Sequence, residues 1–410
     1  MRVVVIGSGI VGASAAYYLS LRGAAVTVVD GGYRGEATQA GAGIVCPWVD
    51  HPEDDDWYRL TREGARHYPG LVEALGEDIG YAKVGALLVA EDPADLEPVR
   101  GLLRRRYPGA PEMGEVIDVD TPSELFPPLS DTLSALLVPG AARVDGCSVR
   151  DALLRAAVAH GAEVRTGAAT LTPDGEVYLH ALAREAVTET APAAPPPPEG
   201  APGEAAGQGG SWRKGAPLAP AAAQGPTSTR APRFADEGVR LEADGVIVAA
   251  GAWTGQVCRP LGVELSVFPR RGQILHVTME GVDTAWWPMV LPRVGPYLLG
   301  FPDSRVVIGA TVEDVGFAPR VTMGGLDEVI RAGLRVAPGL FAATVTEARV
   351  GLRPVYAPGR ALIGRLGGRV VVATGLSAYG LTAGPFTGEI AAALALGEEP
   401  PIDITPYAPA

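Results

Sequence analysis

The first thirty residues alternate between short apolar runs and a longer stretch of small residues. Residues 3–6 form an apolar run with the length of a buried strand, residues 10–21 are rich in Ala and typical of a helix, and a second apolar run ends at Asp30. This order of elements predicts a strand–helix–strand unit at the start of the sequence.

Apolar periodicity predicts further helices and strands along the chain. Helices are expected at three places, residues 57–80, 148–160 and 324–338. Strands are expected at residues 84–92, directly after residue 160, at the start of residues 244–257, and at residues 272–277. Residues 297–312 predict a hairpin that turns at Pro302 and Asp303, and residues 368–397 predict a strand, a glycine turn and a helix.

The length and the charge of the chain narrow the class of protein. With 410 residues, of which 47% are hydrophobic, the chain can bury a large core, and we expect two domains. The net charge of -13 argues against a nucleic acid or an anionic membrane as partner. The sequence leaves the oligomeric state open, a homo-oligomer included.

Neither a membrane span nor a metal site is expected. No apolar run reaches the length of a span, and the first apolar run is the first predicted strand rather than a signal peptide, so we expect a cytoplasmic protein. The cysteines, Cys46, Cys147 and Cys258, form no CxxC pair and have no histidine nearby at the spacing of metal ligands.

Residues 186–233 differ in composition from the rest of the chain. They include Pro195 to Pro198 and many Ala and Gly residues, with few side chains that could fill a core. Such a composition predicts a surface insertion that does not pack. The alternative is a polyproline segment that binds a partner.

Three glycines separate the first strand from the first helix. Gly7 permits a tight turn, Gly9 lets the backbone approach a pyrophosphate, and Gly12 lets the helix pack closely on the strand. The helix N-terminus offers N–H groups to phosphates, and Asp30 can accept hydrogen bonds from ribose hydroxyls. The pattern predicts a dinucleotide site, and an acid at Asp30 disfavours the 2′-phosphate of NADP.

Further motifs resemble those of the D-amino-acid oxidase superfamily, most closely its glycine oxidase and sarcosine oxidase branch and the glycine oxidases of thiamine biosynthesis. The motifs follow the family order and cover nearly the whole chain apart from the insertion. Besides the glycine fingerprint they are ATQAGAGI (37–44), VIVAAGAW (246–253), IGATVEDVGF (308–317), GLRP (351–354) and ATGLSAYGLTAGPFTGEI (373–390).

The resemblance implies a mixed α/β (α+β) fold with a discontinuous, Rossmann-like FAD-binding domain. A second domain, with a mixed and largely antiparallel sheet, would bind the substrate. The expected FAD-binding domain comprises residues 1–50, 143–185, 234–262 and 346–410. The expected substrate domain comprises residues 51–142 and 263–345, and residues 186–233 form the insertion.

The resemblance also implies a set of residues around FAD. The pyrophosphate would lie on the glycine turn, the ribose at the end of the second strand, the adenine at the strand near residue 170, and the flavin at residues 37–44 and at the C-terminal glycine turn. The expected residues are Gly7, Gly9, Ile10, Val11, Gly12, Asp30, Gly31, Ala37, Thr38, Ala42, Gly43, Ile44, Thr170, Gly251, Gly375, Leu376, Ser377, Ala378, Tyr379, Gly380, Leu381 and Thr382.

Arg353, in the motif GLRP, matches the family arginine that binds the substrate carboxylate. Its planar fork suits a bidentate carboxylate pair better than a lysine would. The alternative is a surface arginine in an ordinary salt bridge. Tyr297 matches a family tyrosine that hydrogen-bonds the same carboxylate, and a plain core or rim aromatic is the equal alternative.

Two positions depart from the family pattern. Arg349 stands where relatives usually have Trp, and Leu376 stands where a polar residue such as His is common. If residues 349–353 are extended, Arg349 and Arg353 share a face of the strand. Arg349 then either serves a second acid group of the substrate or pairs with Glu347 or another acid.

The motif CPWVDH (46–51) leaves three further questions. Trp48 either roofs the pocket or packs as a loop residue, and His51 is expected to have no catalytic role. Cys46 does not match the cysteine that carries the flavin in sarcosine oxidases, so noncovalent FAD is expected.

The resemblance implies oxidation of a small amino acid or amine, of the glycine, sarcosine or D-amino acid type, to its imine. The α-hydrogen would leave as a hydride to flavin N5, with O2 as the acceptor that yields H2O2. One alternative is a dehydrogenase of a D-amino acid or 2-hydroxy acid with another electron acceptor. Another is a flavoprotein subunit of a larger complex.

Overall fold

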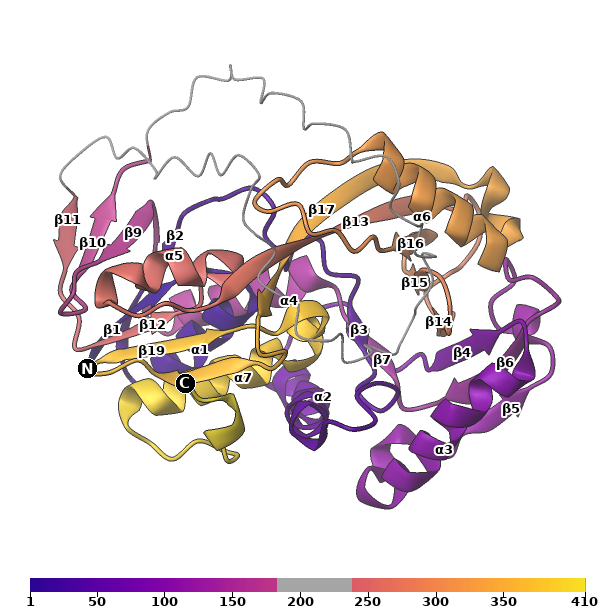
Figure 1. The fold of residues 1–410 in the computed structure, drawn as a ribbon, viewed down its shortest axis with the longest axis horizontal. Helices are drawn as coiled ribbons and strands as arrows, with labels where there is room; N and C mark the ends of the chain where they lie inside the picture. The colour runs from indigo at the N-terminus through magenta and orange to yellow at the C-terminus, as the bar shows by residue number, and fades with distance from the viewer. Residues whose placement is uncertain (183–237, 410) are drawn as a thin grey trace, which may run out of the picture.

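The computed structural model describes residues 1–182 and 238–409, and most of its strands belong to two sheets that lie side by side (Figure 1). The insertion expected at residues 186–233 lies outside the described residues. In the part of the chain that is described, no helix has both the length and the apolar character needed to cross a membrane.

The first sheet has six strands in the order β18-β19-β12-β1-β2-β8. All neighbours are parallel except β18 and β19. Its central strands are buried on both faces, as is typical of parallel sheets between layers. The bounds are β18 Leu362–Arg365, β19 Val370–Thr374, β12 Gly245–Val248, β1 Arg2–Ile6, β2 Ala25–Asp30 and β8 Glu163–Thr166.

Side chains of this sheet alternate between two cores. Val3 and Val5 join the core beneath the helices, whereas Val4 and Ile6 join the core on the opposite face. Helices pack on the first face, namely α1 Ile10–Leu21, α2 Asp55–Leu75, α4 Gly146–Ala159 and α7 Gly380–Leu396. The second face carries α5 Thr254–Cys258 and a small sheet of β9 Ala168–Leu171, β10 Val177–His180 and β11 Val239–Leu241 (Figure 1).

Helices α1 and α7 approach each other closely because small residues line their contact. A Cβ atom at Gly384 would lie 2.7 Å from the Ile10 side chain, and one at Gly388 would lie 2.5 Å from Ser14 Cβ. The Ser14 hydroxyl donates to the carbonyl of Pro385 at 2.6 Å. The C-terminal helix therefore fixes α1, the helix that follows the glycine turn.

The second sheet has eight strands in the order β17-β13-β16-β15-β14-β4-β6-β5, antiparallel except for the pair β14 and β4. Helices α6 Met323–Val336 and α3 Glu97–Arg106 pack against it. A two-stranded pair, β3 Ile44–Val45 and β7 Ala142–Arg143, completes the fold. The bounds are β17 Thr344–Tyr356, β13 Val267–Thr278, β16 Arg305–Gly309, β15 Tyr297–Phe301, β14 Met289–Pro292, β4 Ala86–Ala90, β6 Ser134–Val138 and β5 Ile117–Val119.

The structure confirms the expected mixed α/β fold with one parallel and one largely antiparallel sheet. The predicted hairpin is also confirmed, since β15 and β16 pair on either side of residues 302–304. The division into domains stays a prediction. Strand β17 begins within one expected domain and continues into the other, and it pairs with β13 along its length (Figure 1).

Candidate cofactor and substrate site

A cavity of about 360 Å³ lies between the two sheets. One end is formed by the carboxyl ends of β1 and β2, and the other by β15 and β17. Ligands of open parallel sheets bind outside the carboxyl ends of the strands. The cavity thus joins a nucleotide-type site to the face of the second sheet.

The glycine turn adopts the conformation that its sequence predicts. Gly7 has a φ of 104°, and a Cβ atom there would lie 2.4 Å from the carbonyl oxygen of Ala249. Gly9, Ile10 and Val11 line the cavity with Gly7. Gly12 does not, because it faces the turn itself, where a Cβ atom would lie 1.9 Å from Gly7 O.

Asp30 lies at the end of β2 and lines the cavity beside the start of α1. Its carboxylate accepts hydrogen bonds from the Ser8 hydroxyl and from the N–H of Gly32, the latter at 2.8 Å. Gly31 follows in the lining, and Tyr33 stacks on Trp253 at 5.4 Å. A carboxylate next to the N-terminus of α1 suits a ribose joined to a pyrophosphate.

Residues 37–44 continue the lining from the nucleotide end. The Thr38 hydroxyl accepts a hydrogen bond from the N–H of Ile10 at 3.0 Å, which ties this segment to α1. Gly43 has a φ of 98°, and a Cβ atom there would lie 1.9 Å from Val144 O. The predicted residues that line the cavity here are Ala37, Thr38, Ala42, Gly43 and Ile44.

The C-terminal glycine turn closes the cavity opposite this segment. Thr382 donates to the carbonyl of Ile44 at 2.8 Å, and the Tyr379 hydroxyl donates to the Asp50 carboxylate at 2.9 Å. Because α7 begins at Gly380, its positive end faces the cavity and can stabilise an anion there. The predicted residues that line the cavity here are Gly251, Leu376, Ser377, Ala378, Tyr379, Gly380, Leu381 and Thr382.

Two other predicted residues lie off the cavity. Gly375, with a φ of 78°, packs against Tyr356 and the backbone near Leu362, so it shapes the turn from behind. The Thr170 hydroxyl shares a 2.8 Å hydrogen bond with His180, while its neighbour Ala169 lines the cavity. Strand alternation explains this, because adjacent residues face opposite sides.

Arg353 projects from β17 into the cavity and lies across β13. A Cβ atom at Gly272 would lie 2.4 Å from its guanidinium nitrogens, so this glycine leaves the space that the arginine fills. Its Nη1 donates to the carbonyls of Thr311 at 3.1 Å and Arg271 at 3.4 Å. Within residues 1–182 and 238–409, Arg353 has no carboxylate partner, so a cation faces the cavity without an opposite charge.

Tyr297 starts β15 and lines the cavity near Arg353. A Cβ atom at Gly309 would lie 2.9 Å from its hydroxyl, so a small residue again leaves the space. Burial raises the pKa of the Tyr297 hydroxyl, and the Arg353 guanidinium partly offsets this rise. The hydroxyl therefore stays protonated at neutral pH and can donate a hydrogen bond.

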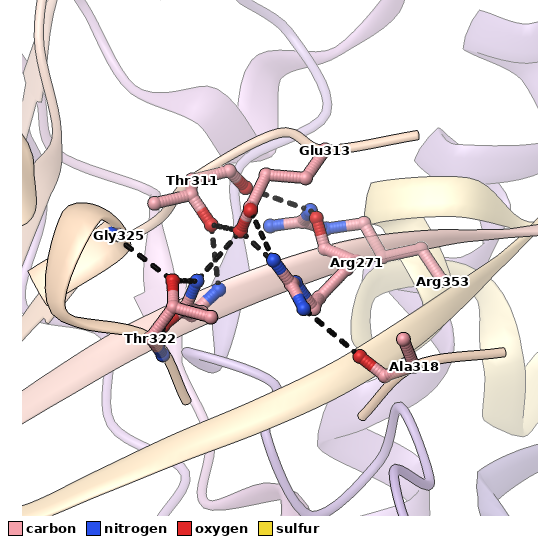
Figure 2. A network of polar contacts seen from close by, with 8 residues as sticks. Arg271, Thr311, Glu313, Ala318, Thr322, Gly325 and Arg353 are labelled. Atoms are coloured by element: carbon pink, nitrogen blue, oxygen red, sulfur yellow. Dashed lines mark hydrogen bonds and ion pairs between the residues drawn. The ribbon is translucent and has the colours of Figure 1, made fainter. Parts of the chain in front are cut away.

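A polar network lies beside Arg353 (Figure 2). Glu313 forms an ion pair with Arg271 of β13 and accepts hydrogen bonds from the Thr311 hydroxyl and from Gln273 Nε2, both at 2.7 Å. The Gln273 amide also donates to the hydroxyl of Thr322, the N-cap of α6, and accepts from the N–H of the same residue. The network joins β13, the segment 310–322 and α6.

Arg349, Trp48 and His51, whose roles the sequence left open or doubtful, have the following places in the structure. Arg349 pairs with Glu347 at 2.8 Å and donates to Gln39 O, and it does not line the cavity. Trp48 is buried in the core around β4 and does not line the cavity either. His51 stacks on Trp57, and burial lowers its pKa.

Cys46 lines the cavity and is buried. Burial and the nearby Asp50 charge raise the pKa of its thiol. A raised pKa disfavours the thiolate that covalent attachment requires. The described residues also contain no cluster of His, Cys, Asp or Glu that could hold a metal ion.

Sequence reasoning missed several residues of the cavity. Asp50 and Arg293 are charged residues that line it from loops; Asp50 lies within CPWVDH (46–51) but drew no expectation there, and no motif contains Arg293. Trp253 belongs to a quoted motif, but only the stacking on Tyr33 and the contact with Phe317 reveal its place at the nucleotide end. Gly272 had no signal in the sequence, since its role depends on pairing between β13 and β17.

The residues fit FAD at both ends, with a glycine turn and ribose carboxylate at one and the positive end of α7 at the other. The sequence profile of the family "FAD dependent oxidoreductase" (DAO) matches residues 2–191 and 203–394. The oxidoreductase YurR of Bacillus subtilis (strain 168) is 37% identical over 99% of this chain and 98% of its own length. A glycine oxidase of Pseudomonas aeruginosa (strain PAO1) is 27% identical over 100% of this chain and 98% of its own length.

A solved structure gives the same relationship in three dimensions. Iminodiacetate oxidase (IdaA) from Chelativorans sp. BNC1 is 39% identical and superimposes with a TM-score of 0.84 over 100% of this chain and 99% of its own. The overall fold is thus shared with this solved structure.

Proposed function

The chain belongs to the DAO family of FAD-dependent oxidoreductases, and from this premise we propose that it oxidises a small amino acid, or an amine that bears a carboxylate, to the imine. Glycine, sarcosine and D-amino acids are the substrate types that this proposal covers. The imine would then hydrolyse in water.

One observation carries the proposal: the Arg353 guanidinium faces the cavity and has no carboxylate partner among the described residues. A half-buried cation of this kind is stabilised when an anion binds it. The planar fork of arginine favours a carboxylate held by two hydrogen bonds.

We assign the binding step to Arg353 and Tyr297, which would hold the substrate carboxylate between them. When bound, FAD would supply the acceptor for a hydride from the α-carbon. The protein contributes proximity and orientation, because a fixed carboxylate sets the direction of the α-hydrogen. The predicted residues on the cavity wall from Gly7 to Ile44 and from Gly251 to Thr382 would hold the cofactor.

We further propose that FAD is bound without a covalent link and that O2 is the electron acceptor, with H2O2 as product. The raised pKa of Cys46 supports the first point. A dehydrogenase with another acceptor, and the oxidation of a 2-hydroxy acid held by the same arginine, are the alternatives.

The experiment is anaerobic reduction of the holoenzyme by a panel of small compounds. Glycine, sarcosine, D- and L-alanine, iminodiacetate and glycolate are mixed with the enzyme, and flavin absorbance is followed. Bleaching by at least one amino acid, with recovery and H2O2 formation after exposure to air, is the expected result. Bleaching by glycolate alone would favour the hydroxy acid alternative, and no bleaching at all would contradict the proposal.

A second candidate substrate class is an amino acid with two carboxylates. Arg293 supports it, since it lines the same cavity from the turn that leads into β15, near Tyr297. The 39% identity with iminodiacetate oxidase supports it as well, because iminodiacetate carries two carboxylates on one amine. Asp50, on the cavity wall, would face the ammonium group of such a substrate.

The two classes can be separated with Arg293→Gln. If a second carboxylate binds there, the KM for iminodiacetate should rise about 10- to 100-fold, as expected for the loss of a charge-assisted hydrogen bond. The KM for glycine should stay unchanged, because glycine has only the carboxylate assigned to Arg353. Equal effects on both substrates would argue against this second class.

A further inference from the structure

The Glu313 carboxylate belongs to the polar network beside Arg353, near the substrate end of the cavity. It forms an ion pair with buried Arg271 and accepts hydrogen bonds from Thr311 and Gln273 (Figure 2). The backbones of Arg271 and Glu313 also bond to each other in both directions, at 2.9 and 3.0 Å. Side chain and main chain together fix Glu313 against β13.

Thr311 connects this carboxylate to the substrate arginine. Its hydroxyl donates to Glu313 and accepts from the N–H of Gln273 at 2.9 Å, so its side chain is held from two directions. Its carbonyl accepts from Arg353 Nη1 at 3.1 Å. Glu313 therefore fixes the orientation of Thr311, and Arg353 hydrogen-bonds to the carbonyl of the same residue.

The two arginines of this network differ in their partners. Two guanidinium groups contact this network: Arg271 pairs with the Glu313 carboxylate, and Arg353 bonds to the backbone of Arg271 and Thr311. Arg271 donates to that carboxylate and to Ala318 O, the latter at 3.0 Å, whereas Arg353 donates to backbone carbonyls. Among the described residues, the carboxylate of this network is thus paired with Arg271, whereas Arg353 has only neutral partners.

We propose that Glu313 is a positioning residue for the substrate-binding arginine. It fixes Thr311, whose carbonyl accepts a hydrogen bond from Arg353, and so helps to orient the guanidinium toward a substrate carboxylate. This inference rests on the proposed function, since it assigns Arg353 to carboxylate binding.

Glu313 is charged at neutral pH, as this role requires. Burial alone would raise the pKa of its carboxyl group, but hydrogen bonds from Arg271, Gln273 and Thr311 outweigh that effect and lower the pKa below its ordinary value. The ion pair therefore persists at neutral pH, where an amino acid also carries its own carboxylate.

The test replaces the carboxylate by an amide of the same shape. Acetate serves as the probe, because it carries a carboxylate and no amine, and its binding to the holoenzyme is followed by the change in flavin absorbance. In Glu313→Gln the acetate Kd should rise about 10-fold, the size expected when an arginine loses part of its orientation rather than its charge. The FAD content should change little, whereas the melting temperature should fall, because buried Arg271 loses its ion-pair partner.

Glycine turnover adds a readout that a loss of folding could not produce. The KM for glycine should rise by the same factor as the acetate Kd, with kcat within about threefold of the unmodified enzyme. Asp314→Asn is the matched control, because Asp314 is the next residue of the same segment and forms an exposed ion pair with Arg270 at 2.8 Å. It should leave both constants unchanged.

A second pair of variants keeps the inference testable if Glu313→Gln fails to fold. Thr311→Val removes the hydroxyl that meets Glu313 and should weaken acetate binding, whereas Thr311→Ser retains that hydroxyl and should not. Acetate binding unchanged in both Glu313→Gln and Thr311→Val would overturn the inference. An unmodified enzyme that binds no acetate would instead contradict the carboxylate site proposed at Arg353.

Discussion

At the scale of single residues, the substrate end of the cavity depends on two glycines that leave room for larger side chains. Gly272 and Gly309 lie where a Cβ atom would meet Arg353 at 2.4 Å and the Tyr297 hydroxyl at 2.9 Å. Both glycines belong to strands, where glycine costs stability unless another group needs the space. Their positions indicate that the fold reserves room for the two proposed substrate-binding side chains.

Gly272→Ala tests this reservation of space. The added methyl group would push the guanidinium of Arg353 aside, because the clash is with the end of a flexible side chain and not with backbone. We expect the KM for a carboxylate substrate to rise at least about 10-fold, with FAD content unchanged. Steady-state kinetics and the ratio of flavin to protein absorbance provide the measurement.

Gly324→Ala is the control for that variant, because a Cβ atom there would meet nothing within 4 Å. It should leave the KM and the FAD content as they are. If Gly272→Ala behaves like Gly324→Ala, Arg353 does not need the space above Gly272 and its assigned position is wrong.

The resemblance to the family predicted Arg353, which lies in GLRP, and Tyr297, which matches a family tyrosine, and both line the cavity. It could not predict Asp50 or Arg293, since their approach to the cavity depends on loops whose path tertiary contacts decide. Arg106 illustrates this dependence: it donates to the carbonyls of Trp48, Asp50 and His51 and so shapes the loop that carries Asp50.

At the scale of elements, the contact between α1 and α7 links the C-terminus of the chain to the nucleotide end of the cavity. A Cβ atom at Gly388 would lie 2.5 Å from Ser14 Cβ and 2.7 Å from the backbone N of Ala15. Gly388→Ala must therefore move one helix. We expect roughly 1–3 kcal/mol of destabilisation from overpacking, seen as a lower melting temperature, together with weaker FAD retention.

Gly70→Ala in α2 provides the comparison, because a Cβ atom at this exposed helical glycine meets nothing within 4 Å. Alanine is the better helix former by about 1 kcal/mol, so the melting temperature should rise or stay constant. Loss of FAD by Gly70→Ala but not by Gly388→Ala would show that the contact of α1 and α7 does not support the cofactor site.

The periodicity of the sequence predicted the elements with a regular apolar pattern and missed those without one. The helices α2, α4, α6 and α7 and the strands β1, β2, β4, β12 and β19 were expected from such patterns. Helix α3 was missed, since three of its ten residues are the consecutive Arg104, Arg105 and Arg106. Strand β17 lacks a buried first half, so its extent is set by pairing with β13.

At the scale of the whole molecule, the cavity lies where two sheets meet and draws its walls from segments far apart in the sequence. A ligand that fills such a cavity stabilises the folded state by RT ln(1 + [L]/Kd), about 2.7 kcal/mol at 100 times Kd. We expect the melting temperature to fall when FAD is removed and to recover when FAD is added back. FMN should restore less, because it lacks the adenosine that Asp30 would hold.

The same preparation tests the mode of attachment. Heat or acid denaturation should release intact FAD into the supernatant, since the buried Cys46 thiol is a poor nucleophile. Flavin that remains with the precipitated chain would show a covalent link and would identify Cys46 for mass analysis.

The central claim is that Arg353 anchors a substrate carboxylate against FAD, and Arg353→Ala tests it most directly. With the amino acid that bleaches the unmodified holoenzyme fastest, we expect kcat/KM to fall about 30- to 1000-fold, mainly through KM, while FAD content is unchanged. Arg353→Lys should recover only part of the loss, because a point charge cannot replace the fork. A kcat/KM in Arg353→Ala within about twofold of the unmodified enzyme, for every carboxylate substrate, would contradict the account.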